Sequence, residues 1–462
     1  MKKGFRLIAL LAALALVAAA CGDDTSDTTA TTAAATTTTA DAGGGDTTTT
    51  TEDTMMGPIF DVGVTEEPCT NGSPDRGCIQ LGSVTDQTAT FAAASPGLLA
   101  GHQLFWARVN ASGGIGGLFD VEIVDEAIVN NNYDPATHVE VYQQIREDVL
   151  ALAESLGTSQ TLAALPDMID DNMVSAPATW WSGWNYAESD GGLILESGAS
   201  YCVEAMNSVD FALGNFPGGA ATVGVVYLPN DYGLDYLAGV KIAAEANGLE
   251  VLFEQQTLPV GLDPGQTEAV NAVVTNSADV TFLVTGPSET ATIVGTAAAG
   301  GHQKPFIGAG PSWNAALLAS PAAAAFEAGI YFNSAPWGSW ATDTPGHEAM
   351  RAMADAAGAP ASNFVSAGWV EQYPLKAALE AAVAAGDITR AGLVAAAQSL
   401  GEVDFEGMVE TVANYGANPI VTSSVVGAVD PAAPDGITIL GGGPFTGPTA
   451  AAFDYSGPCF AG

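Results

Sequence analysis

Short apolar runs of strand length alternate with longer stretches of helical periodicity along most of the chain, beginning at Cys78. The first series predicts strands at 78–84, 119–127, 148–155 and 172–179. It also predicts helices at 96–112, at 134–147 and, after a loop at 156–161, to near Asp171. The second series predicts a helix at 232–248 and strands at 221–228, 249–256, 278–286, 304–310 and 327–335.

Repeated alternation of strands and helices favours parallel sheets that are covered by helices on both faces. Two such series predict an α/β protein with two doubly wound lobes. Ligands of such sheets bind beyond the carboxyl ends of the strands.

The first twenty residues have a different pattern. A basic start, with Lys2, Lys3 and Arg6, precedes an apolar run from Leu7 to Val17 and three alanines. These features predict a secretory signal peptide at 1–20, which is too short to span a membrane. No later run approaches the length of about 18 apolar residues that a membrane span needs.

Cys21 follows these small residues directly, and the junction resembles the lipobox of bacterial lipoproteins. In that motif the cysteine is acylated and becomes the new N-terminus. Ala18 stands where the motif usually has leucine, and the other interpretation is an ordinary signal peptide followed by an incidental cysteine. Residues 21–57 are rich in Thr, Asp and Gly, a composition that favours a disordered linker. We therefore expect an exported protein that is lipid-anchored at the outer face of the cell membrane.

Composition excludes some partners. The 462 residues include 11 Lys plus Arg and 52 Asp plus Glu, which gives a net charge of −41. Nucleic-acid binding requires clustered cations, so we expect no nucleic-acid partner. The membrane is expected to be a partner only through the lipid anchor.

Four cysteines remain if Cys21 carries a lipid, and an even number in an exported chain favours disulfides. Cys69 and Cys78 flank a turn-rich loop that could close locally, which would leave Cys202 to pair with Cys459. The other two pairings of four cysteines remain open at this stage. Paired zinc-ligand spacing is absent and the four histidines are scattered singly, so no metal and no cofactor is expected.

An ordered set of short segments resembles the leucine/isoleucine/valine-type periplasmic binding proteins, the type I solute-binding proteins of ABC transporters. The segments are "IQLGSVTDQTATF", the turn "NASGGIGG" at 110–117, an Asp-Pro helix start at 134, "GTSQT", "SAPAT", "YLPNDYG" and "FLVTGPSETATIV". The resemblance covers residues 78 to 400. It implies two lobes joined by a three-segment hinge that close on a small molecule. The expected boundaries are 58–199 for the first part of lobe 1, 200–335 for the main part of lobe 2, 336–400 for the return to lobe 1, and 401–462 for the return to lobe 2 with the C-terminal tail.

The resemblance also implies ligand contacts. Ser159, or the neighbouring Thr158, and Thr179 match the hydroxyl residues that hold the ligand carboxylate in this family. Pro177 matches a residue whose carbonyl faces the ligand amine. The aromatic contacts of the family match Phe91 in the first lobe and Tyr232 in the second.

Two positions depart from the family. Gly310 stands where the amino-acid binders have a glutamate that pairs with the ammonium, and Gly286 stands where they have a tyrosine. A buried ammonium without a partner is costly. Either another acid serves, such as Asp86, Asp231 or Glu371, or the ligand is not a simple α-amino acid.

Several tryptophans fall in or beside predicted loops, and each could face the cleft or simply pack the lobes and hinge. They are Trp180, Trp181, Trp184, Trp313, Trp337, Trp340 and Trp369.

The expected function is capture of a small molecule, such as an amino acid, an amide or a short organic acid, and its delivery to an ABC transporter permease. We expect a monomer that is not an enzyme, because hydrolase, metalloprotease and phosphate-binding motifs are absent. The alternative is a ligand-sensing ectodomain for signalling or adhesion, because one fold serves several uses. A sensor would be expected to continue into a membrane-spanning helix.

Overall fold

The computed structural model describes residues 58–216 and 218–461. The predicted signal peptide, Cys21 and the linker lie outside these residues. Within the described ranges, no helix is both long enough and apolar enough to cross a membrane.

The first lobe is built on a five-stranded sheet in which β3 lies between β4 and β5, and β6 follows β5. These four strands are parallel, and the short β2 adds an antiparallel contact to β3. The strand order reverses beside β3, which marks the switch point where doubly wound sheets bind ligands. The strands are β2 (Val64–Thr65), β3 (Gly77–Thr85), β4 (Phe119–Asn130), β5 (Ala151–Leu156) and β6 (Ser175–Ala178).

The second lobe repeats this order in a seven-stranded sheet, with β7 between β8 and β9 and with β10 and β11 following β9. β13 and β14 extend its far edge in antiparallel orientation. The strands are β7 (Thr222–Tyr227), β8 (Glu250–Gln256), β9 (Val280–Val284), β10 (Phe306–Gly308), β11 (Tyr331–Ala335), β13 (Val425–Val429) and β14 (Ile437–Ile439).

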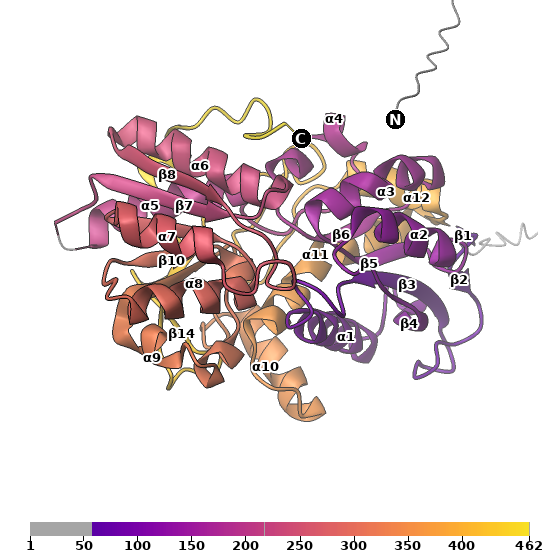
Figure 1. The fold of residues 1–462 in the computed structure, drawn as a ribbon. Coiled ribbons are helices and arrows are strands. Elements are labelled where there is room, and N and C mark those ends of the chain that lie inside the picture. Colours follow the sequence, from indigo (N-terminus) through magenta and orange to yellow (C-terminus); the bar gives the residue numbers. More distant parts are fainter. Residues whose placement is uncertain (1–57, 217, 462) are drawn as a thin grey trace, which may run out of the picture. The chain divides into compact units, whose positions relative to one another are not determined.

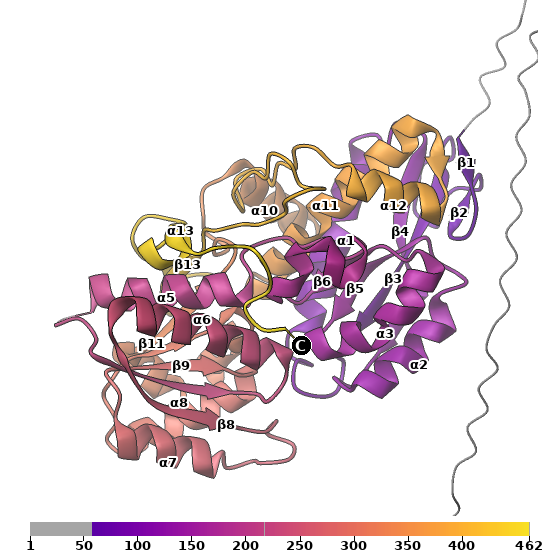
Figure 2. The same ribbon diagram turned by 90° about the horizontal axis from the view of Figure 1, so that it is seen from above.

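Helices cover both sheets, as strands that are buried on both faces require. Figures 1 and 2 show α11 and α12 beside the elements of the first lobe, although they follow the second lobe in sequence. The first-lobe helices are α1 (Ser95–Ala111), α2 (Pro135–Ile145), α3 (Thr158–Asp171), α10 (Pro345–Ala357), α11 (Asn363–Ala385) and α12 (Arg390–Gln398). The second-lobe helices are α5 (Tyr201–Asn215), α6 (Asp231–Asn247), α7 (Thr267–Asn276), α8 (Pro287–Ala299), α9 (Ala323–Ala325) and α13 (Pro448–Ala452). The short α4 (Ala187–Asp190) lies in the first crossover, and β1 (Ile59–Phe60) pairs with β12 (Asp387–Ile388).

Close packing of α1 on α11 depends on two glycines. A Cβ at Gly101 would lie 2.4 Å from the carbonyl oxygen of Val365, and one at Gly368 would lie 2.2 Å from that of Leu98. Each helix therefore needs glycine at the crossing point. This contact fixes α11 to the first lobe.

The chain passes between the lobes three times. The first two passages run from β6 to α5 and from β11 to α10, and the third precedes β13. Glu406 accepts hydrogen bonds from the guanidinium of Arg108 in α1 at 2.7 and 2.9 Å. Because this contact holds the turn around Glu406 on the first lobe, we propose that the final return begins near Val421 rather than at 401.

Most predicted elements occur close to their expected ranges, and two differences have a local cause. The strand predicted at 327–335 begins only at Tyr331, because residues 326–330 form a helical turn in which Gly329 has a φ of 75°. The loop predicted at 156–161 contains the start of α3 at Thr158. That helix begins without a capping side chain, so its first turn lacks the usual sequence signal.

Candidate ligand-binding site

A small cavity of about 30 Å³ is lined by both lobes. It lies beyond the carboxyl ends of β3, β5 and β6 in the first lobe and of β7 and β10 in the second. A space of this size matches about one water molecule, so a ligand must enter while the lobes or side chains are further apart. The lining residues are Phe91, Ala94, Leu98, Tyr133, Leu156, Gly157, Thr158, Ala178, Trp180, Tyr201, Tyr232, Pro311 and Phe364.

Five of these residues form a continuous series of touching rings that we call the aromatic chain. It runs from Tyr133 to Phe91, Tyr232, Tyr201 and Trp180, with successive centroids 4.8, 6.3, 4.6 and 6.1 Å apart. The first two rings belong to the first lobe, the next two belong to the second, and Trp180 opens the first crossover. The chain therefore offers an apolar, aromatic wall that crosses from one lobe to the other.

The polar corner of the cavity is the start of α3. Gly157 precedes this helix with a φ of 98°, and no side chain caps the helix end. The first N–H groups of a helix have no partner within it and favour a negative group. The hydroxyls of Thr158 and Thr179 lie 2.5 Å apart beside this end, and both residues are buried. The corner can therefore bind a carboxylate without a cation.

Ser159, the other hydroxyl considered at this position, faces across the lobes. Its Oγ donates a hydrogen bond to the carboxylate of Asp231 at the start of α6. The neighbouring Asn230 donates from Nδ2 to the Tyr133 hydroxyl at 3.0 Å. Of the two adjacent hydroxyl residues, Thr158 lines the cavity and Ser159 holds the lobes together.

The remaining positions carried over from the family lie around the cavity rather than in its wall. Pro177 is buried in β6 opposite Ser155 of β5. Gly286 precedes α8, where a Cβ would lie 2.6 Å from Oε2 of Glu289 and 2.9 Å from Thr90 of the first lobe. A tyrosine has no room at Gly286 in this closed arrangement.

Gly310 has a buried acid beside it that the sequence did not reveal. Its N–H donates to Oε1 of Glu204 at 2.8 Å, and the Ser334 hydroxyl donates to the same oxygen at 2.5 Å. Burial raises the pKa of Glu204 to about 7. Glu204 does not line the cavity, so it offers no direct partner to a ligand ammonium.

The three acids considered as substitutes have other partners. Asp86 accepts hydrogen bonds from three backbone N–H groups in the loop 88–91. Glu371 lies 2.7 Å from Nε2 of His102 inside the first lobe, and Asp231 bonds to Ser159. None of them lines the cavity, and no charged side chain does.

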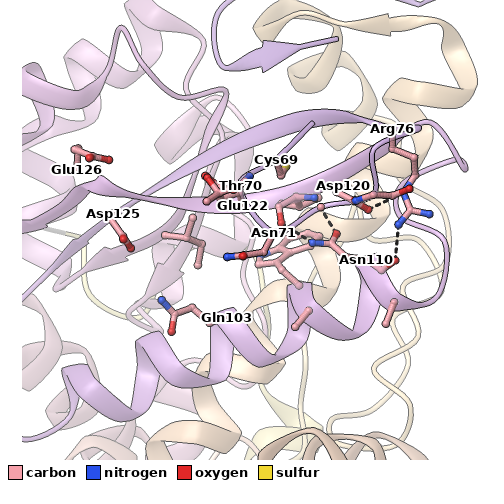
Figure 3. A pocket seen from close by; sticks show the side chains of 17 residues that line it. Cys69, Thr70, Asn71, Arg76, Gln103, Asn110, Asp120, Glu122, Asp125 and Glu126 are labelled. Atoms are coloured by element: carbon pink, nitrogen blue, oxygen red, sulfur yellow. Dashed lines mark hydrogen bonds and ion pairs between the residues drawn. The ribbon is translucent and has the colours of Figure 1, made fainter. Parts of the chain in front are cut away.

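A larger groove of about 780 Å³ lies on the first lobe, between α1 and β4 (Figure 3). Two of its charged side chains, Asp125 and Glu126, are exposed, and the other three have partners. Arg76 donates to Asp120 at 2.8 Å, and Glu122 accepts from the backbone and the hydroxyl of Thr70. This groove is polar, belongs to one lobe and is lined by none of the expected ligand contacts.

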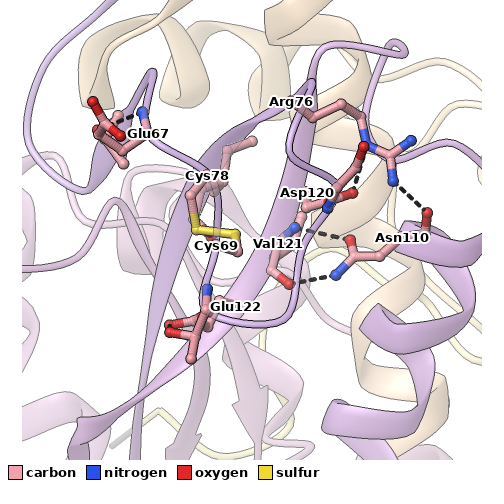
Figure 4. The surroundings of a disulfide bond; sticks show 12 residues. Glu67, Cys69, Arg76, Cys78, Asn110, Asp120, Val121 and Glu122 are labelled. Atoms are coloured by element: carbon pink, nitrogen blue, oxygen red, sulfur yellow. Dashed lines mark hydrogen bonds and ion pairs between the residues drawn. A yellow bond between two sulfur atoms is a disulfide. The ribbon is translucent and has the colours of Figure 1, made fainter.

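Both expected disulfides are present. Cys69 pairs with Cys78 at the side of this groove (Figure 4), and Cys202 pairs with Cys459. Within the described residues, the one grouping of possible metal ligands consists of Cys69, Cys78 and Glu122. Its two sulfur atoms are bonded to each other and cannot serve as thiolate ligands.

Several lining residues were not anticipated from the sequence. Tyr133, Tyr201 and Phe364 come from a loop and from the first residues of α5 and α11. A signal was available for Tyr201, because Ser200 caps α5 through its side chain and places the next residue at the start of a helix. Trp180 also faces the cavity, whereas Trp181, Trp184, Trp313, Trp337, Trp340 and Trp369 are buried elsewhere.

The two lobes have the same strand order, the chain passes between them three times, and a cavity lies at their strand ends. Together these features define a solute-binding protein of the type I fold. The sequence matches the periplasmic binding protein family over residues 78–450. The chain therefore belongs to this family, whose members capture ligands for ABC transporters and are not enzymes. The family implies an extracytoplasmic location. A search of curated proteins found no match.

Solved structures agree with this assignment. A fatty acid ABC transporter substrate-binding protein from Thermomonospora curvata is 28% identical, with a TM-score of 0.74 over 85% of this chain and 97% of its own. A branched chain amino acid ABC transporter protein from Thermus thermophilus with bound valine is 16% identical, with a TM-score of 0.68 over 81% and 98%. A solute binding protein from R. palustris in complex with 4-hydroxybenzoate is 16% identical, with a TM-score of 0.64 over 80% and 97%. The last two similarities concern the fold.

Proposed function

We propose that this protein captures a small carboxylate with an apolar body and delivers it to an ABC importer. The carboxylate would bind at the start of α3, where Thr158 and Thr179 lie, and the apolar body would lie along the aromatic chain. Ser159 would help to hold the two lobes closed, and Tyr232 would form part of the aromatic wall. The observation that carries this proposal is a cavity without charged side chains whose polar corner is an uncapped helix start.

A free amino acid fits this site poorly. Its ammonium would be buried without a partner, which costs several kcal/mol relative to water. Gly310 supplies no acid, and the nearby Glu204, whose Oε1 accepts two hydrogen bonds and whose Oε2 has no partner, does not line the cavity. We therefore expect valine and leucine to bind weakly or not at all, in contrast to an apolar carboxylate of similar size.

The name of one similar protein supports this ligand class. The protein from Thermomonospora curvata, which is 28% identical to this chain, is described as a fatty acid binder, and a fatty acid combines a carboxylate with an apolar body.

Calorimetry tests the proposal with a panel of ligands. The panel comprises unbranched fatty acids from butyrate to dodecanoate, benzoate, 4-hydroxybenzoate, valine, leucine and the matching amides. Native mass spectrometry of the freshly purified protein would identify a ligand that co-purifies. We expect at least one carboxylate to bind and its amide to bind far more weakly. Tight binding of valine or leucine would contradict the ligand class while leaving the transport role intact.

We also propose that the protein is anchored to the membrane through a lipid on Cys21, which lies outside the described residues. The signal-like residues 1–20 and the linker 21–57 support this anchor. Cys21→Ala should move the protein from the membrane fraction to the soluble extracytoplasmic fraction. An unchanged membrane-bound fraction would contradict the anchor.

A further inference from the structure

The C-terminal residues of the described chain are bonded to residues that adjoin the cavity lining in sequence. Cys459 forms a disulfide with Cys202, which lies 257 positions earlier. The Cys459 N–H donates to the Ser182 hydroxyl at 2.9 Å, and the Trp181 indole N–H donates to the carbonyl of Phe460 at 2.9 Å.

Asp235 of α6 lies at the centre of these contacts and is fully buried. It accepts hydrogen bonds from the N–H and hydroxyl of Ser182 at 3.0 and 2.5 Å, and from the N–H of Cys202 at 3.2 Å. We call Ser182, Cys202, Asp235, Cys459 and Phe460 the tail clamp.

Three rings of the aromatic chain lie next to members of the tail clamp. Tyr201 directly precedes Cys202, Trp180 lies two residues before Ser182, and Tyr232 lies one helical turn before Asp235. The Tyr201 N–H also donates to the Trp180 carbonyl at 2.7 Å. The clamp thus joins the three segments that carry these rings: the first crossover, α5 and α6.

We propose that the tail clamp is a positioning device for ligand binding, which fixes Trp180, Tyr201 and Tyr232 in a preformed wall without touching the ligand. The proposal rests on the proposed function, because it takes these rings as the wall of the ligand site. Its physical basis is that rings held in place before binding lose less conformational freedom when the ligand arrives.

The competing explanation is that the disulfide only stabilises the fold, since closing a long loop restricts the unfolded chain. The second disulfide provides a matched control. Cys69–Cys78 lies in the first lobe beside the large groove, and neither of its cysteines lines the cavity. A purely stabilising role predicts no specific effect of either disulfide on the rings.

The test compares two pairs of variants in the full-length protein. The first pair is Cys202→Ser with Cys459→Ser, and Asp235→Asn alone. The control pair is Cys69→Ser with Cys78→Ser, and Asp120→Asn alone, since Asp120 is a fully buried acid next to the other disulfide. Trp181→Phe, which removes the indole bond to Phe460 and keeps an aromatic ring, replaces the clamp variants if they fail to fold.

The readouts are the fluorine resonance of Trp180 in protein labelled with 5-fluorotryptophan, assigned with Trp180→Phe, and the affinity for decanoate and benzoate. Both are measured well below the melting temperature. We expect the clamp variants to shift and broaden the Trp180 resonance and to weaken carboxylate binding about ten-fold or more, as expected for a wall that is no longer preformed. The control pair should leave both unchanged.

An unchanged Trp180 resonance in the clamp variants would overturn the proposal, whatever the ligand proves to be. Equal effects of the clamp and control pairs would also overturn it, because they would indicate general destabilisation. A shifted Trp180 resonance in a protein that binds neither probe would support the clamp and contradict the ligand class alone.

Discussion

At the scale of residues, the polar corner depends on two threonine hydroxyls. Thr158 and Thr179 lie 2.5 Å apart, so one hydroxyl donates to the other, and the accepting hydroxyl keeps its own hydrogen for a further acceptor. A carboxylate at the start of α3 would be such an acceptor. Its charge makes that hydrogen bond stronger than a bond between neutral groups.

Thr179→Val removes the hydroxyl but keeps the shape of the side chain. We expect the dissociation constant for the best carboxylate to rise about ten- to a hundred-fold, because a hydrogen bond to a charged group contributes about 1.5–3 kcal/mol. Isothermal titration calorimetry measures the change, and Thr179→Ser, which retains the hydroxyl, is the control. Wild-type affinity in Thr179→Val would show that the carboxylate binds elsewhere.

At the scale of elements, a hydrogen bond between side chains joins α3 to α6. Ser159 and Asp231 link the two lobes at the rim of the cavity and do not line it. Such a bond exists only when the lobes are closed, so it adds to ligand affinity by favouring that state.

Ser159→Ala and Asp231→Ala should each weaken ligand binding by about ten-fold or more, because a hydrogen bond to a carboxylate contributes about 1.5–3 kcal/mol. The double variant should lose little more than either single variant, because both remove the same bond. Calorimetry of the four proteins completes the cycle. Additive losses would mean that the two residues act separately.

A second element-scale feature lies between α1, β5 and α11. His102 of α1 lies 2.7 Å from Glu371 of α11 and 3.9 Å from Glu154 of β5, and all three are fully buried. Burial lowers the pKa of His102 to about 3 and raises the pKa of Glu154 to about 7. Burial also raises the pKa of Glu371 well above its ordinary value. The interior of the first lobe therefore favours the uncharged forms of all three groups.

This arrangement predicts a loss of stability as the pH rises. The unfolded chain releases the Glu154 proton near pH 4.3, whereas the folded chain keeps it to about pH 7, so the free energy of unfolding falls between these values. The fall is on the order of 3 kcal/mol for Glu154. Urea unfolding of the wild type and of Glu154→Gln, measured from pH 5 to pH 8, covers the upper part of this pH range. The free energy of unfolding should depend less steeply on pH in the variant than in the wild type. An equal slope in both proteins would contradict the assignment, and the exposed Glu188→Gln serves as the control.

At the scale of the whole molecule, the fold could be predicted from the sequence because it depends on local periodicity. The runs that form β5 and β9 are mostly apolar and buried, and α2 begins with an Asp cap and proline. The resemblance to the binding-protein family then gave the order of the lobes. The antiparallel β13 and β14 were not anticipated, because two short strands near the C-terminus have no helix between them to mark them.

The candidate site was only partly predictable, because it depends on contacts between distant segments. Phe91 and Tyr232 were expected beside the ligand and do line the cavity, but their neighbour Tyr201 comes from a helix start without a family signal. Glu204 reaches Gly310 from a helix more than one hundred positions earlier. No local pattern in the sequence reveals such a pairing.

The charge of the whole chain predicts a dependence on salt. With 52 acidic and 11 basic residues, repulsion among carboxylates opposes the compact state. Raising sodium chloride from about 0.1 M to about 1 M shortens the screening length from about 10 Å to about 3 Å. We expect the melting temperature to rise over this range, as calorimetry would show. A falling melting temperature would mean that attractive ion pairs outweigh the repulsion.

The central claim is that one apolar carboxylate is held between the lobes, and a crystal structure with the tightest-binding carboxylate tests it most directly. We expect the carboxylate at the start of α3, within hydrogen-bonding distance of Thr158 or Thr179, and the apolar body against Phe91, Tyr201 and Tyr232. A ligand bound in the large groove of the first lobe, or held between the lobes through an ammonium on an acid such as Glu204, would contradict the account.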